Sequence, residues 1–500
     1  MAVAAPAADK AAATFGIHIG STSMSIAVSG TGRPEVLANP AGERVTPAVV
    51  RYMEGEQVVG TAAKQGSVRH AAITAARVRC LLSADDRQAA LQSRFCPVDE
   101  ERGFIIRHDE KEEVHPAEEV LKTLLKYLHD VAQRQVGSEQ TQFDSVLAVP
   151  VHFAPSERQT LRRAAEEAGF HVRQTVLEPV AALMAHDVGQ SPQETAPLVC
   201  LVVRAGGATS DAAVVRSSAG LYTLVESVHR ADLGGDALTD LVADFLAGEC
   251  RAKWKTDPRE SRKALAKLRS AAEVAKHVLS TMATAQCFVE SLLDGVDFGC
   301  QVTRARLESV LGPALQQWVD LARAAVAAAG VSTVDRLVLV GGTAKIPRLQ
   351  RILAAAFPDA TLLTSPSSDE LVAEGAARQS ALIEDRSLDD APQTVAVCAR
   401  PVYIQFGETE PTLAVPAGAP VPSVHIAEHV TGAEGALNVV LTEGSEEGAE
   451  RPVLAKMEVT RPAGARLVAT LVLRREMGLR IRLLDANTGE ALEADVAVSA

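Results

Sequence analysis

Residues 198–215, LVCLVVRAGGATSDAAVV, carry the pattern that decides the fold. Two runs rich in Val, Leu and Ala flank a turn of small residues at 205–208, so the stretch predicts a hairpin of two strands. Residues 15–28, FGIHIGSTSMSIAV, have the same arrangement. Two strand–turn–strand units in one chain suggest two related lobes, although the repeat is weak in the sequence alone.

Helices and strands alternate around these two hairpins, and this alternation predicts α/β layers. The helix expected over 259–280 is rich in Ala, Lys and Arg. Further helices are expected at 116–131, at 156–168 and from about residue 347, and buried-type strands at 145–149 and 335–340.

The pattern changes near residue 385. Residues 384–392 are polar and rich in residues that break regular structure, as in a linker. Beyond them apolar and polar residues alternate, most clearly in 402–406, 437–441, 467–473 and 479–483, which predicts an antiparallel β-sandwich. We therefore expect a tail over 1–13, an α/β domain over 14–384, a linker over 385–394 and a β-sandwich domain over 395–500.

Composition limits the class of protein. Of the 500 residues, 47% are hydrophobic and 23% charged, as in soluble globular proteins. The net charge of −13 argues against direct binding of nucleic acid, which depends on basic surface. We expect no membrane-spanning helix and no signal peptide. Seven dispersed cysteines suit the reducing cytosol, where buried thiols act as small apolar side chains.

Glycine-rich turns are the first candidate for chemistry. Without a Cβ, backbone N–H groups can approach an anion such as phosphate. The turns at 16–22 and 206–209 could each do this, or each could be a hairpin turn without a ligand. Together with those at 234–235 and 341–342, they could converge on one nucleotide.

The helix expected over 259–280 offers a second candidate. Glu273, Lys276 and Ser280 stand at i, i+3 and i+7 and therefore share one face. That face could hydrogen-bond a ribose. Alternatively, it is a solvated Glu–Lys pair with a serine near the end of the helix.

These motifs, in this order and spacing, resemble the heat shock protein 70 family over nearly the whole chain. The resemblance implies an α/β fold class, with an actin-like, two-lobed ATPase domain of ribonuclease H-like lobes. A small all-β sandwich domain for peptide binding would follow. In a departure from the family, we expect no helical lid. The matching stretches are 16–22, 45–50, 59–64, 149–158, 178–179, 206–209, 233–235, 340–347, 369–370 and 375–376.

The resemblance also implies a site for ATP, in which ADP could bind instead. Glu178 matches a residue proposed to orient water, Arg79 aligns with the family's catalytic Lys, and Asp211 matches a carboxylate of the second lobe. The residues expected to hold the nucleotide are Gly20, Ser21, Thr22, Gly206, Gly207, Thr209, Gly234, Gly235, Glu273, Lys276, Ser280, Gly341, Gly342, Thr343, Lys345 and Asp369.

Three substitutions depart from the family's pattern. His18 and Arg204 replace two aspartates that belong near hydrated Mg²⁺, and Arg79 replaces the catalytic Lys. The loss of two carboxylates and the gain of a cation weaken a divalent metal site. A guanidinium also cannot occupy the space of a compact ammonium. We expect ATP binding with weak or no turnover. Whether Mg²⁺ binds stays open. The alternative that the pocket is a relic and binds no nucleotide also stays open.

The combined features resemble one atypical branch of the family, the lidless subunit of the animal ribosome-associated complex. This branch implies a co-chaperone in a stable heterodimer with a zuotin-type J-domain protein, which carries it to the ribosome. The pair would assist a conventional heat shock protein 70 in folding nascent polypeptides in the cytosol. No membrane contact and no direct contact with nucleic acid are expected.

Other functions stay open at this point. The chain could be an active, lidless chaperone that hydrolyses ATP and binds unfolded clients itself. It could also be a sugar-kinase-like enzyme or a nucleotide exchange factor. Phosphate release would separate the enzymes from the co-chaperone.

Overall fold

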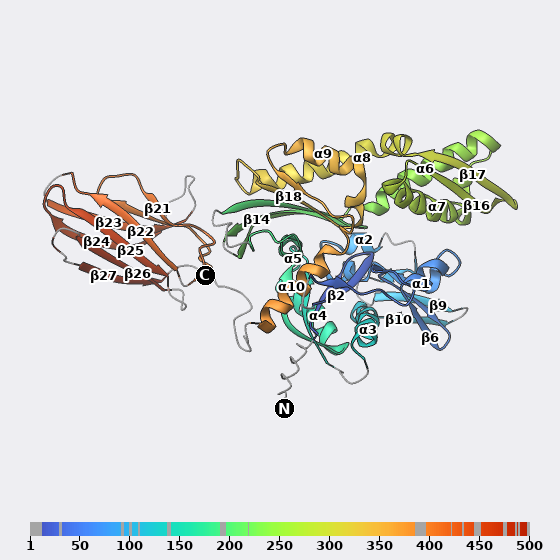
Figure 1. Cartoon of the computed structure of the whole chain (residues 1–500), viewed down its shortest axis with the longest axis horizontal. Coiled ribbons are helices and arrows are strands. Elements are labelled where there is room, and N and C mark those ends of the chain that lie inside the picture. The colour runs from blue at the N-terminus through green and yellow to red at the C-terminus, as the bar shows by residue number, and fades with distance from the viewer. Residues whose placement is uncertain are drawn as a thin grey trace, which may run out of the picture. The chain divides into compact units, whose positions relative to one another are not determined.

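The computed structural model describes residues 13–29, 33–91, 95–99, 103–108, 111–137, 142–190, 197–218, 220–385, 397–421, 423–432, 435–444, 452–473, 478–485, 488 and 491–497. The chain divides into two compact units, Met1–Leu388 and Asp389–Ala500 (Figure 1). Most of the expected tail and linker lies outside the described residues, and the bounds given for them stay a prediction.

The first lobe of the larger unit is built on a mixed sheet with the strand order β12-β11-β1-β2-β3, in which β4 also pairs with β2. The strands β1 and β2 form the expected hairpin, and β11 and β12 extend the sheet in parallel on the other side of β1. The strands are β1 (Phe15–Ile19), β2 (Ser23–Val28), β3 (Glu35–Val36), β4 (Thr46–Pro47), β11 (Phe143–Val149) and β12 (Phe170–Leu177).

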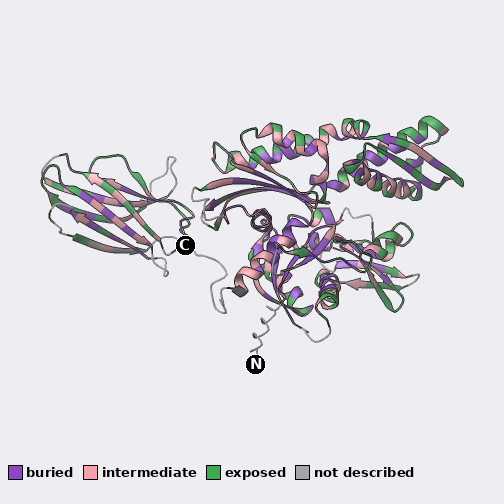
Figure 2. Cartoon of the chain, in the orientation of Figure 1, coloured by how far each residue is buried: buried purple, intermediate pink, exposed green. Residues whose placement is uncertain are grey.

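The second lobe repeats this topology in the order β15-β14-β13-β18-β19. Three antiparallel strands are again extended by two parallel ones, so the repeat that is weak in sequence is plain in the strand order. Figure 2 shows the middle strands of these sheets as largely buried. The strands are β13 (Leu198–Ala205), β14 (Ser210–Ser218), β15 (Leu221–Arg230), β18 (Arg336–Val340) and β19 (Thr361–Leu363).

The helices α5 and α10 pack against each other; α10 also contacts β1 and β11, and α5 also contacts β13 and β18. Glycine permits the close packing of α10, since a Cβ on Gly16 would lie 2.0 Å from the backbone nitrogen of Ala377. The helices of this unit are α1 (Thr61–Gly66), α2 (Arg87–Leu91), α3 (Ala117–Val136), α4 (Pro155–Glu167), α5 (Glu178–Ala185), α6 (Gly235–Trp254), α7 (Arg262–Thr281), α8 (Arg304–Ala328), α9 (Pro347–Ala356) and α10 (Leu371–Asp385).

One expected helix begins later than its composition suggested. The hydroxyl of Ser261 accepts a hydrogen bond from the N–H of Ala264 and caps α7, so the helix starts at Arg262 rather than at 259. The preceding residues form a 3₁₀ turn. The remaining elements are β5 (Val49–Met53), β6 (Glu56–Val59), β7 (Thr74–Ala76), β8 (Val98–Asp99), β9 (Gly103–His108), β10 (Lys111–His115), β16 (Thr284–Leu293), β17 (Val296–Thr303) and the 3₁₀ turns η1 (Ala71–Ile73), η2 (Val78–Leu82), η3 (Pro258–Glu260) and η4 (Gly342–Lys345).

The smaller unit is an antiparallel sandwich of two four-stranded sheets, β21-β20-β23-β24 and β22-β25-β26-β27. The α/β unit of two lobes followed by this sandwich confirms the fold class expected from the sequence. Within the described residues, no helix is both long and apolar enough to cross a membrane. The strands are β20 (Val402–Phe406), β21 (Thr412–Val415), β22 (Ser423–Val430), β23 (Gly435–Glu443), β24 (Val453–Arg461), β25 (Arg466–Leu473), β26 (Gly478–Asp485) and β27 (Ala491–Ala497).

The four regions of clear alternation correspond to β20, β23, β25 and β26, whose apolar residues face the core. The strand β22 was not among these regions, although Val424 and Ile426 alternate with Ser423 and His425 in its sequence. Both apolar side chains are exposed in the structure.

Candidate functional site

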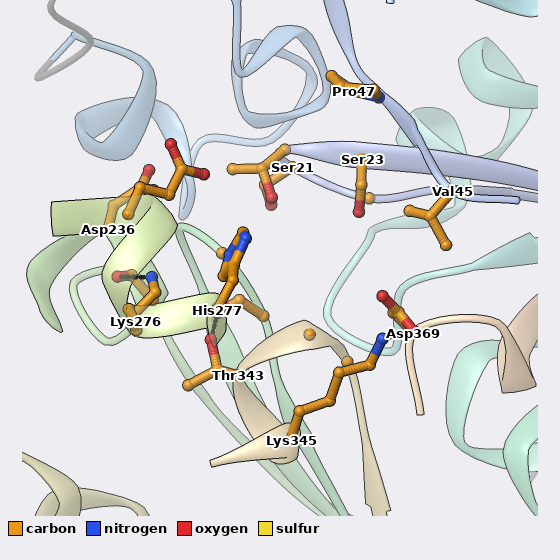
Figure 3. Close-up of a pocket in the computed structure, with 18 of the residues that line it drawn as sticks. Ser21, Ser23, Val45, Pro47, Asp236, Lys276, His277, Thr343, Lys345 and Asp369 are labelled. Carbon is orange, nitrogen blue, oxygen red and sulfur yellow. Dashed lines mark hydrogen bonds and ion pairs between the residues drawn. The ribbon is translucent and has the colours of Figure 1, made fainter. Parts of the chain in front are cut away.

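A cavity of about 730 Å³ opens between the two lobes of the larger unit, and Figure 3 shows part of its lining. Glycine turns reach it from the ends of three strands, with Gly20 after β1, Gly206 after β13 and Gly341 after β18. The expected nucleotide residues that line it are Gly20, Ser21, Thr22, Gly206, Gly207, Gly235, Glu273, Lys276, Ser280, Gly341, Gly342, Thr343, Lys345 and Asp369.

Two residues of the expected set are not part of the lining. Gly234 packs behind the turn, because a Cβ there would lie 2.5 Å from the carbonyl oxygen of Gly207. The side chain of Thr209 is buried, and its hydroxyl lies 3.4 Å from that of Ser21. Both residues support the turns that form the cavity wall.

The glycines let neighbouring turns approach each other closely, and Gly207 does so across the two lobes. A Cβ on Gly207 would lie 2.1 Å from Oγ1 of Thr22, and one on Gly235 would lie 2.5 Å from Oγ1 of Thr343. Only glycine fits at either position without a shift of its neighbours. Bare backbone around a cavity of this size suits the phosphates of a nucleotide.

The face of α7 that was singled out in the sequence does point into the cavity. Lys276 is buried, and its Nζ donates to the carbonyl oxygen of Gly235 at 2.7 Å and to Oγ1 of Thr239 at 2.8 Å. Burial lowers the pKa of this ammonium. Because an ammonium has three N–H donors, one remains for a ligand. The hydroxyl of Ser280 donates to the carbonyl oxygen of Lys276, which leaves its oxygen able to accept.

An ion pair joins the two lobes at the cavity. Nζ of Lys64, on α1, donates to Oε1 of Glu273, on α7, at 2.7 Å. Burial would raise the pKa of Glu273, but Lys64 and Lys276 hold it lower. One carboxylate oxygen of Glu273 is therefore already paired across the cavity and is not free for a ribose.

Lys345 has a partner as well. Its Nζ lies 2.6 Å from Oδ1 of Asp369, and Figure 3 shows its side chain extending toward that residue. The resemblance puts an arginine that stacks on the base at this position. In this chain the ammonium is held beside a carboxylate on the cavity wall.

Four buried side chains form what we call the buried charge cluster: Arg79, Glu178, Arg204 and Asp211. Nη1 of Arg79 donates to Oε1 of Glu178 at 2.7 Å, and Nε of Arg204 lies 3.1 Å from Oε2 of the same carboxylate. Nε of Arg204 also donates to Oδ2 of Asp211 at 2.5 Å. Two cations and two anions thus balance one another at the cavity wall, where Arg204 belongs to the lining.

The electrostatics follow from this pairing. Burial would raise the pKa of Glu178, but Arg79 and Arg204 hold it well below its usual range. Burial would likewise lower the pKa of Arg204, but Asp211 and Glu178 raise it. Glu178 and Arg204 therefore stay charged at neutral pH.

This arrangement does not fit a divalent cation. Mg²⁺ takes oxygen ligands, yet the carboxylates of Glu178 and Asp211 are both occupied by guanidinium groups. His18, which also lines the cavity, has its Nε2 3.4 Å from Oε1 of Glu178. Of the substituted positions, His18 and Arg204 reach the cavity, whereas Arg79, like Glu178 and Asp211, is outside its lining.

Sequence reasoning missed several residues at the site. His277 lines the cavity at i+4 from Glu273, so the helical spacing that identified Ser280 could also have found it. Lys64 is the last residue of the stretch 59–64, which matched the family, but the residue was not assigned a role. Asp236, at the start of α6, pairs with Nη2 of Arg77 at 2.6 Å, a contact without a sequence signal.

A second cluster lies outside the cavity lining. Oδ1 of the buried Asp86 is 2.6 Å from Nε2 of His229, and Oδ2 is 3.1 Å from Nε2 of His152. The two imidazole rings stack with their centroids 3.7 Å apart. These three residues come from separate segments, and no motif linked them.

Comparison with known proteins adds to this geometry. A family profile described as Hsp70 protein matches residues 14–392. Three curated proteins, each named heat shock 70 kDa protein 14, match nearly end to end. The one from Xenopus tropicalis is 33% identical over 96% of this chain and 98% of its own length. The one from Danio rerio is 34% identical over 98% and 100%, and the one from Rattus norvegicus is 33% identical over 97% and 100%.

Proposed function

The chain belongs to the heat shock protein 70 family, and we propose that it is a co-chaperone that binds ATP and hydrolyses it weakly or not at all. Members of this family are chaperones that bind ATP or ADP. The observation that carries the proposal is the pairing of Glu178 with Arg79 and Arg204.

Binding of ATP is supported by the lining of the cavity. The turns at Gly20, Gly206 and Gly341 can present backbone N–H groups to the phosphates. The remaining donor of Lys276 and the oxygen of Ser280 can bind the ribose. These contacts hold a nucleotide without taking part in bond cleavage.

Weak turnover is supported by the buried charge cluster. Phosphoryl transfer normally depends on metal ions that neutralise charge and on a residue that orients the nucleophile. Here Glu178 accepts a hydrogen bond from Arg79 and lies beside Arg204, so two guanidinium groups neutralise the carboxylate that would orient a water. Arg79 is fixed as well, since it also donates to the carbonyl oxygen of Ile19 and to Oγ of Ser21.

The finer proposal concerns partners. We propose a stable heterodimer with a zuotin-type J-domain protein, which would hold this chain at the ribosome in the cytosol. There the pair would stimulate a conventional heat shock protein 70 that acts on nascent polypeptides. The end-to-end match to proteins named heat shock 70 kDa protein 14 supports this branch. The acidic net charge of −13 is consistent with ribosome contact through the partner.

A single-turnover assay tests the nucleotide proposal. The full chain is loaded with γ-labelled ATP, and bound label and released phosphate are followed together with and without Mg²⁺. We expect retained ATP and negligible release under both conditions. Prompt release would favour the active chaperone, and absence of bound label would make the pocket a relic.

A matched pair of variants sharpens the assay. The triple variant H18D/R79K/R204D restores the residue types of the family, and we expect it to gain Mg²⁺-dependent phosphate release. The control is Arg107→Lys, which alters an exposed arginine paired with Glu112. Co-expression with a zuotin-type J-domain protein, followed by gel filtration, tests the heterodimer; separate elution of the two chains would contradict it.

A further inference from the structure

Two cysteines lie directly opposite each other on the hairpin of β16 and β17. In the antiparallel register Cys287 pairs with Cys300, so both side chains leave the hairpin on the same face. Opposed residues in such a ladder have Cα atoms about 4.5 or 5.5 Å apart. A disulfide spans Cα separations of about 4.4–6.8 Å. The backbone is therefore already spaced for a crosslink.

The two thiols already interact. A hydrogen bond from Cys300 lowers the pKa of the Cys287 thiol, against the opposing effect of burial. The same hydrogen bond, together with burial, raises the pKa of the Cys300 thiol.

Access differs between the two sulfurs. Cys287 is 3% exposed, whereas Cys300 is partly exposed. An oxidant in solution can therefore reach Cys300 first, and Cys287 is in position to react second. In the strand pairings of the described residues, no other two cysteines stand opposite each other.

We propose that Cys287 and Cys300 form a reversible disulfide, with a small-molecule disulfide such as oxidised glutathione as the oxidant. Cys300, the sulfur that the oxidant reaches first, loses its proton to the solvent and attacks one sulfur of the oxidant, and one glutathione thiolate leaves. The thiolate of Cys287 then attacks the Cys300 sulfur of the mixed disulfide, and the second glutathione leaves. Two protein thiols are oxidised to one disulfide and one oxidant molecule is reduced to two thiols.

The two cysteines lie on a hairpin that packs against a helix of the cavity lining. The strand β16 packs along α7, the helix that carries Glu273, Lys276 and Ser280. A crosslink between β16 and β17 would restrain the hairpin that supports this helix. The disulfide proposal rests on register and access alone, and holds whether or not the cavity binds ATP.

The test uses the reduced full chain, incubated with oxidised glutathione while folded. The product is cleaved without reduction at Glu290 or Asp294, which lie between the two cysteines, and analysed by mass spectrometry. We expect two of the seven thiols to be lost and the two peptides to be joined by a bond that dithiothreitol breaks.

Variants establish the order of the steps. Cys287→Ser should retain glutathione on Cys300, because the resolving thiol is missing, and Cys300→Ser should remain unmodified at Cys287. The control Cys250→Ala, which changes a buried thiol on α6, should form the crosslink as the parent does. The proposal is overturned if both thiols stay reduced in the folded chain, if the crosslink appears only after unfolding, or if glutathione persists on Cys300 of the parent.

Discussion

Nε of Arg204 lies 3.1 Å from Oε2 of Glu178, and both side chains are almost fully buried. The arginine belongs to β13 of the second lobe, and the glutamate begins α5. The contact therefore places a fixed positive charge from the chain itself at a position where the resemblance expects a carboxylate near a metal ion. Stability and nucleotide chemistry both depend on this charge.

Replacement of Arg204 by alanine should destabilise the larger unit. The change leaves Asp211 without its guanidinium and Glu178 with Arg79 as its guanidinium partner and His18 nearby, in a buried environment. Breaking a buried pair typically costs about 3–5 kcal/mol of unfolding free energy. Denaturant titration followed by circular dichroism measures the loss. The control Arg163→Ala removes an exposed pair with Glu118 and should cost under about 1 kcal/mol. Equal effects of the two variants would contradict the prediction.

Replacement of Gly207 by alanine should weaken ATP binding. The new Cβ would lie 2.1 Å from Oγ1 of Thr22, so the turns of the two lobes must move apart. A loss of about 1.4 kcal/mol, or tenfold in Kd, is the expected minimum, and calorimetric titration with ATP measures it. The control Gly248→Ala adds a methyl group in α6 where no atom lies within 4 Å. Unchanged affinity in the Gly207 variant would show that these turns do not hold the ligand.

Removal of the ion pair between the lobes should speed nucleotide release. Lys64 and Glu273 connect α1 to α7 across the cavity; Lys64 is exposed and Glu273 is half-buried. Such a pair is worth about 0.2–1 kcal/mol, so Lys64→Ala should raise the dissociation rate up to about fivefold. Stopped-flow release of a fluorescent ATP analogue measures the rate. Lys122→Ala, which removes an exposed pair with Glu167, serves as the control. An effect that persists unchanged at high salt would argue against an electrostatic cause.

Asp86 should make stability depend on pH in acid. Burial alone would raise its pKa, but hydrogen bonds from His152 and His229, with the charge of Arg79, hold it well below its usual range. The folded-state pKa thus lies below the unfolded-state value of about 3.9. The stabilisation is complete above the unfolded-state pKa and is lost as the pH falls from there toward the folded-state pKa.

The measurement compares the parent with Asp86→Asn by denaturant titration across a pH series. The difference in unfolding free energy should be largest near neutral pH and shrink below about pH 4. Asp320→Asn, at an exposed position on α8, is the matched control and should change little. A difference between parent and Asp86→Asn that stays constant down to strongly acidic pH would contradict the assignment.

Many elements of the fold could be predicted from the pattern of neighbouring residues. The hairpins around Gly20 and Gly206 were predicted because apolar strands and small turn residues are adjacent in the chain. The face of α7 with Glu273 and Ser280 was predicted because helical spacing is a local property. The edge strand β22 was not predicted, although Val424 and Ile426 alternate with polar residues there, and these apolar side chains are exposed instead of packed in the core.

The partners of the charged residues were not accessible in the same way. The sequence identified Arg79 and Arg204 as departures from the family's pattern and Glu178 as a match to it. It did not indicate that both arginines pair with the one carboxylate of Glu178. Arg79 and Glu178 are 99 residues apart, and the packing of separate elements brings them within 2.7 Å. The pairing of Lys64 with Glu273 is likewise a contact between lobes.

The sequence by itself determined the two-lobed α/β unit, the β-sandwich and the glycine turns, because hydrophobic periodicity and the backbone freedom of glycine depend only on residues that are neighbours in the chain. Only the tertiary structure decided which glycines line the cavity, which charges neutralise one another, and that Cys287 faces Cys300. Those relationships depend on strand register and on packing between distant segments, and an ion pair or a pair of opposed thiols exists only once that packing is complete.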